Sequence, residues 1–124
     1  MRKLLGLLVL LVFAAGAAAD VDDLVKKLGS KDNEERRAAA KDLGDLGKDA
    51  KPAVKALTRA LGDGDTYVVQ FSAEALGRLA TSEDKAAVSA LEAITKNAKL
   101  PNNNPLKRAA TQALKQIRGR KSDS

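Results

Sequence analysis

Residues 54–79 read VKALTRALGDGDTYVVQFSAEALGRL, and their apolar spacing is the strongest indication of the fold. The same spacing occurs 33 residues earlier, in residues 21–46, VDDLVKKLGSKDNEERRAAAKDLGDL. Five apolar positions recur in this register: Val21 and Val54, Leu24 and Leu57, Leu28 and Leu61, Leu43 and Leu76, Leu46 and Leu79. A repeat of this length is typical of stacked supersecondary units, which present a surface to partners more often than a pocket for chemistry.

Each unit is predicted to be a helical hairpin, because its apolar residues twice follow the i, i+3, i+4, i+7 pattern of an amphipathic helix. A third, less regular copy follows: Leu76 to Leu114 spans 38 residues because residues 99–105, KLPNNNP, lengthen the last hairpin loop. We therefore predict an all-α solenoid of about three hairpins. The expected boundaries are units at 20–47, 50–80 and 84–118, with a flexible basic tail at 119–124.

The starts of the second helices carry capping residues. Asp32 is followed three residues later by Glu35, which predicts a capping box. Asp65 is expected to begin the second helix of the middle unit. Asn104 and Pro105 are expected to cap and begin that of the last unit.

A family resemblance rests on these segments. Residues 32–44, DNEERRAAAKDLG, resemble the second half of a HEAT repeat of the short type first described in phycobilisome lyases. Residues 63–77 match the same pattern, residues 107–114 form a weaker copy, and residues 52–57 resemble the start of the first helix. The resemblance implies an armadillo-like α-solenoid and a role in protein interaction, and it carries no lyase activity to this chain. Glu35 departs from the pattern, which has Val68 and Leu106 at this position, as suits a less buried terminal unit.

The first 19 residues have the layout of a secretory signal peptide: Arg2 and Lys3, an apolar run from Leu4 to Phe13, then small residues to Ala19. The alternative is an uncleaved membrane anchor, but the apolar stretch is shorter than the roughly 20 residues that a spanning helix needs. We expect cleavage near Ala19 and export from a bacterial cell, to the periplasm or beyond it.

The composition argues against catalysis. The chain has no His and no Cys, which excludes the usual nucleophile–base pairs and zinc sites. Residues 63–74 weakly resemble a calcium loop, but Val68 stands where the turn needs Gly, so a turn and helix cap is preferred. We expect no enzyme activity, no cofactor, no metal and no small-molecule substrate.

The second helices also predict a binding surface. The positions opposite their apolar stripes form columns across the stack, on the side that lines the concave face of HEAT solenoids. Six residues are predicted to contact a protein partner there: Arg37, Lys41, Gln70, Glu74, Arg108 and Gln112. A third column, Asp45, Arg78 and Gln116, runs beside them.

Charge is uneven along the chain. Residues 96–121 hold eight basic residues and no acid: Lys96, Lys99, Lys107, Arg108, Lys115, Arg118, Arg120 and Lys121. This basic patch either keeps the open end of the stack soluble or binds an anionic polymer, nucleic acid or membrane surface. Since no aromatic residue lies among these cations, base stacking is not expected.

Two aromatic residues remain after residue 19. Phe71 stands where the other units have Ala38 and Ala109, and is expected to fill space in the middle unit rather than to anchor a partner. Tyr67 suits a peripheral packing role and a partner contact equally well.

Overall fold

The computed structural model describes residues 17–120, and within this range the chain is helical without any β-strand. The elements are α2 (Ala17–Lys27), α3 (Asn33–Leu46), the 3₁₀ helix η1 (Gly47–Ala53), α4 (Val54–Ala60), α5 (Thr66–Leu79), α6 (Lys85–Thr95) and α7 (Pro105–Gly119). The all-α prediction is confirmed. Residues 1–16 of the predicted signal peptide lie outside the described range. None of the helices in residues 17–120 is long and apolar enough to cross a membrane.

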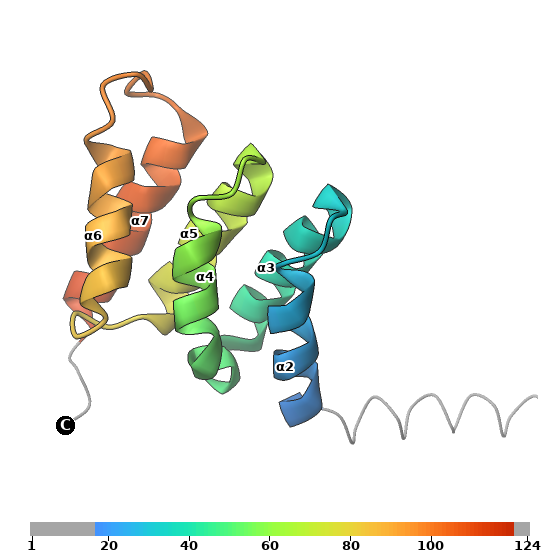
Figure 1. Ribbon diagram of the computed structural model, residues 1–124. Helices are drawn as coiled ribbons and strands as arrows, with labels where there is room; N and C mark the ends of the chain where they lie inside the picture. The colour runs from blue at the N-terminus through green and yellow to red at the C-terminus, as the bar shows by residue number, and fades with distance from the viewer. Residues whose placement is uncertain (1–16, 121–124) are drawn as a thin grey trace, which may run out of the picture.

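Three hairpins stand side by side in chain order: α2 with α3, η1 and α4 with α5, and α6 with α7 (Figure 1). Their first helices form one layer, and α3, α5 and α7 form the other. The middle helix α5 packs against both α3 and α7, so the second helices make a continuous inner layer. This arrangement is the predicted α-solenoid of three units.

The core consists of the repeated apolar positions. Leu43, Leu57, Leu76, Leu91 and Ile117 are fully buried. Burying such side chains stabilises each by about 1.5–3 kcal/mol relative to exposure.

Ser72 lies in the core as well, and its hydroxyl is buried without a hydrogen-bond partner. It stands in register with Ala39 and Ala110, which are also buried. The position therefore accommodates a small side chain, but it provides no hydrogen-bond partner for the Ser72 hydroxyl.

The inner helices approach one another closely at glycine. A Cβ added to Gly44 would lie 3.2 Å from Cα of Ala75, and one added to Gly77 would lie 2.9 Å from Cα of Ala113. These glycines recur at the 33-residue step and let α3, α5 and α7 pack backbone to backbone. The first helices of neighbouring hairpins contact each other less closely, which favours curvature with α3, α5 and α7 on the inside.

The predicted caps begin the second helices as expected. The side chains of Asp32, Asp65 and Asn104 accept hydrogen bonds from the first turns of α3, α5 and α7. The capping box is present only in part: Asp32 accepts from the Glu34 N–H at 2.9 Å, whereas Glu35 accepts from the Ser30 hydroxyl at 3.0 Å. Glu35 is exposed, as its place in a terminal unit suggested.

The predicted tail begins too early. Helix α7 extends to Gly119, and the Arg120 guanidinium donates hydrogen bonds to the carbonyl oxygens of Gly77 and Ala80 at the end of α5. Residues 119 and 120 therefore belong to the folded domain, because Gly119 ends α7 and Arg120 satisfies carbonyls that a helix end leaves free. The remaining tail residues, 121–124, lie outside the described range.

Candidate interaction surface on the inner helices

Two adjoining hollows lie on the inner layer. The larger, about 390 Å³, lies between α5 and α7, and the smaller, about 150 Å³, lies between α3 and α5. Glu74 and Arg78 line both hollows. We call this surface the inner face, and it comprises Lys41, Asp45, Phe71, Glu74, Arg78, Arg108, Gln112 and Gln116.

The structure brings together four of the six residues predicted to contact a partner. Lys41 and Glu74 line the smaller hollow, and Glu74, Arg108 and Gln112 line the larger. The half-buried Gln70 lines neither hollow. Most positions of the three predicted columns therefore lie on the inner face, whereas Arg37 and Gln70 lie outside it.

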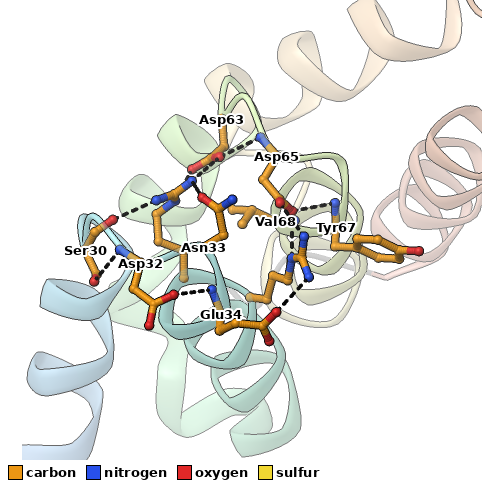
Figure 2. Close-up of polar contacts among 10 residues, drawn as sticks. Ser30, Asp32, Asn33, Glu34, Asp63, Asp65, Tyr67 and Val68 are labelled. Carbon is orange, nitrogen blue, oxygen red and sulfur yellow. Dashed lines mark hydrogen bonds and ion pairs between the residues drawn. The ribbon is translucent and has the colours of Figure 1, made fainter.

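Arg37 is committed to a contact within the chain. Its Nε donates to Asp65 Oδ1 at 3.0 Å and its Nη2 to Asp65 Oδ2 at 2.6 Å, while Nη1 lies 3.2 Å from Glu34 Oε1. Figure 2 shows its two acidic partners, Glu34 and Asp65, on neighbouring hairpins. The hydrogen bond with Asp65 raises the pKa of Arg37. In this structure Arg37 joins the first hairpin to the second.

Asp65 has two roles in that contact. Its Oδ1 also accepts the backbone N–H groups of Tyr67 and Val68, so the same carboxylate caps α5. The hydrogen bond from Arg37 is the main cause that lowers its pKa from 3.8 to about 2. Charge-assisted bidentate pairs of this kind are among the stronger polar contacts in proteins.

A second arginine beside it was not identified from the sequence. Arg36 Nε donates to Asp63 Oδ2 at 2.8 Å, and its other nitrogens reach the Ser30 carbonyl and the Asn33 side chain. Asp63 in turn accepts the backbone N–H of Asp65. Both aspartates of the calcium-like loop, Asp63 and Asp65, therefore accept hydrogen bonds from arginine. Residues 17–120 contain no group of three or more acidic, His or Cys side chains arranged to hold a metal ion.

Tyr67 is the one large apolar side chain that residues 17–120 expose, at 53%. The Arg37 guanidinium carbon lies 4.8 Å from the centre of its ring, a cation–π contact. Its ring centre lies 6.4 Å from that of Phe71, which packs partly against the core and lines the smaller hollow. Tyr67 thus borders the inner face, and its ring is held by Arg37, which Asp65 holds in turn.

The charges of the inner face are only partly paired. Asp45 lies 3.0 Å from Lys41 and 3.2 Å from Arg78, and these contacts, Lys41 first, lower its pKa. Glu74 and Arg108 form no ion pair within residues 17–120. The inner face therefore offers a carboxylate, a guanidinium and amide groups to polar atoms of a partner.

The predicted basic patch is dispersed. Lys96, Lys99 and Lys107 lie at the loop end of the third hairpin, and Arg108 belongs to the inner face. Arg118 pairs with Glu92 at 2.9 Å, and Arg120 binds backbone carbonyls. Lys115 is exposed on α7, and Lys121 lies outside the described residues. The seven cations within residues 17–120 therefore lie on different parts of the third hairpin.

Residues 21–120 match the family described as HEAT repeats. Comparison with curated proteins gives no match. The match covers most of the chain and includes all three hairpins, so this chain belongs to the HEAT repeat family.

Proposed function

We propose that this chain is an exported, non-catalytic interaction module that binds a protein partner on its inner face. HEAT repeats generally mediate protein–protein interaction. The observation that carries the proposal is the pair of adjoining hollows on α3, α5 and α7, bordered by the exposed Tyr67. Within the family we assign the units to the short HEAT-like type, on the 33-residue step.

The chemistry of the inner face suits a polar partner. Arg108 and Glu74 are free of ion pairs within the described residues, and Gln112 and Gln116 present amides beside them. Tyrosine and arginine are enriched among residues that dominate binding energy. Because Arg37 and Asp65 fix the Tyr67 ring, less side-chain entropy is lost when a partner covers it.

The absence of catalysis is supported by the titratable groups. In residues 17–120, shifted pKa values are resolved for Arg37, Asp45 and Asp65, and each shift has an ion pair as its leading cause. Active sites perturb pKa values in clefts where groups converge on a substrate; among the described residues, Asp45 is the one shifted group that lines a hollow, and its neighbours there, Lys41 and Arg78, are cations that hold it ionised. Glu74 alone contributes an unpaired carboxylate to the inner face.

Export is proposed on the layout of residues 1–19, with cleavage near Ala19. Helix α2 begins at Ala17, two residues before this point. The intact mass of the protein recovered from the exported fraction tests the assignment, since cleavage after Ala19 gives a chain that begins at Asp20. Recovery of the full-length mass from the membrane fraction supports the anchor instead.

The inner face is tested by affinity capture from the exported fraction of the producing cells, with Arg108→Glu as the disruptive variant. Arg37 is unsuited to this test because its reversal breaks the contact with Asp65. The matched control is Lys55→Glu, the same kind of charge reversal at an exposed position of α4. We expect Arg108→Glu to reduce recovery of the partner and Lys55→Glu to leave it unchanged. Equal recovery with both variants contradicts the proposal.

A second candidate function is binding of an anionic polymer, nucleic acid or membrane surface. It is favoured by Lys96 and Lys99, which are exposed at one end of the third hairpin. Binding through these lysines predicts retention on an anionic resin that falls steeply with added salt. Partner capture that is insensitive to salt favours the protein-binding function.

A further inference from the structure

The close helix packing between neighbouring hairpins follows one register, and the arginine–aspartate contact is added at the first junction, since Gln70 stands at the position of Arg37 in the second hairpin. Arg37 of the first hairpin binds Asp65 of the second, and Gly44 packs on Ala75. At the next junction Gly77 packs on Ala113 in the same way. Each hairpin thus has one set of positions that contacts the hairpin after it and another that contacts the hairpin before it.

The C-terminal end of the stack carries the first set without a following hairpin. Arg108 occupies the repeat position of Arg37, and Lys115 occupies that of Gly44 and Gly77. Both side chains are exposed, and neither forms an ion pair within residues 17–120. This end therefore presents Lys115 and, at the edge of the hollow that it also lines, an arginine equivalent to Arg37 without its aspartate.

The N-terminal end carries the complementary set. Asp32 occupies the repeat position of Asp65 and caps α3 as Asp65 caps α5. Asp42 occupies the position of Ala75 and Ala113. Both carboxylates are exposed and form no ion pair within the described residues. This end presents an aspartate equivalent to Asp65 without its arginine.

A hollow of about 400 Å³ opens at the same N-terminal end, between α2 and α3. Its lining is mainly acidic around two half-buried leucines: Asp20, Asp23, Leu24, Lys27, Asp42, Asp45 and Leu46. Lys27 is paired with Asp23 at 3.3 Å and Asp45 with Lys41 and Arg78, so Asp20 and Asp42 are the lining aspartates without an ion pair within the described residues. The two ends of the stack therefore have opposite charge at equivalent positions.

We propose that the N-terminal end binds the C-terminal end of a second copy of this chain. In the repeat register, Lys115 of one copy faces Asp42 of the next, and Arg108 faces Asp32. If the ends served only to keep the stack soluble, charge of any sign would be sufficient at each end. Here the two ends carry opposite charges at equivalent positions. A lysine–aspartate pair occupies more space than a glycine–alanine pair, so the helices stand farther apart and the association is weak and salt-sensitive.

Sedimentation velocity tests this proposal on protein purified from cells that express the full chain. At low salt the weight-average sedimentation coefficient should rise with concentration, and added salt should abolish the rise. Lys115→Glu and Asp42→Lys should each weaken self-association about tenfold, because each places like charges at the junction. The double variant should restore it, because glutamate then faces lysine. Lys55→Glu, which makes the same charge change on α4, should behave as the unchanged protein.

Three outcomes overturn the proposal. One is a sedimentation coefficient that stays at the monomer value over the whole concentration range at low salt, in which case the ends act as solubilising caps. Another is a double variant that associates no better than the single variants. The third is a Lys55→Glu variant that weakens association as much as Lys115→Glu, which shows that net charge and not the junction is responsible.

Discussion

The Arg37 guanidinium binds both carboxylate oxygens of Asp65, 28 residues further along the chain, at 3.0 and 2.6 Å. Since the same carboxylate accepts two N–H groups at the start of α5, one residue both caps a helix and joins two hairpins. The second junction uses a different contact, in which Arg120 binds carbonyls at the end of α5. The two junctions of this short stack therefore respond differently to pH.

Asp65→Asn should reduce the dependence of stability on acid pH. The pKa of Asp65 is about 2 in the folded chain, below its ordinary value of 3.8. Its stabilising contribution is therefore fully present above pH about 4 and is lost as the pH falls through about 2. Asparagine keeps the capping oxygen but removes the charge. Thermal unfolding followed by circular dichroism from neutral to acid pH should show curves that converge near pH 2, and parallel curves would contradict this assignment.

Gly77→Ala should destabilise the chain by about 1–3 kcal/mol, because its Cβ would meet the Cα of Ala113 at 2.9 Å and backbone cannot move aside cheaply. Gly44→Ala should cost less, since its nearest atoms lie at 3.2 Å. Gly119→Ala is the control: nothing lies within 4 Å of its Cβ, so the free energy of unfolding should change by less than about 1 kcal/mol. Urea unfolding measures all three, and equal losses at Gly77 and Gly119 would refute the close packing of α5 on α7.

Ser72→Ala should stabilise the chain by about 1 kcal/mol. The hydroxyl is buried without a partner, and such a group carries the cost of lost hydration. Alanine already occupies the equivalent positions 39 and 110. A loss of stability in urea unfolding would show that the hydroxyl has a partner, such as a buried water.

Tyr67→Ala should affect binding more than folding. The ring is 53% exposed, so the free energy of unfolding should change by about 0.5 kcal/mol or less. Removal of a fixed aromatic anchor typically costs binding about 1–3 kcal/mol, a roughly 5- to 150-fold loss of affinity. Parallel measurement of unfolding and partner capture separates the two effects, and unchanged capture would remove Tyr67 from the proposed contact.

Most of the fold could be predicted from the sequence, because the buried core positions recur at the 33-residue step. Leu43 and Leu76 recur at the step and both are fully buried. Asp32, Asp65 and Asn104 identified the helix starts, because a capping oxygen has few alternatives. The end of α7 was misplaced, since the bonds from Arg120 to α5 join residues about 40 apart and leave no local pattern.

The candidate site was predicted less completely. Periodicity located the inner face, but it treated Arg37 as a free contact because the Asp65 carboxylate lies on the next hairpin. The contact between Arg36 and Asp63 was missed for the same reason. The sequence does contain a signal for it, because the Asp-Gly-Asp turn at residues 63–65 follows the Arg-Arg pair at residues 36–37 by nearly one repeat length. Gly44 and Gly77 also recurred at the step, and this spacing could have identified the close packing of the inner helices.

Site-specific photo-crosslinking in the producing cells tests whether a protein partner binds the inner face. A photoreactive residue at position 112 lies on the inner face, and one at position 55 lies on the outer layer with similar exposure. If the inner face binds a protein partner, position 112 should yield a discrete crosslinked protein on illumination and position 55 should not. A crosslinked partner from position 55 alone, or the same products from both positions, would show that the inner face is not the binding surface.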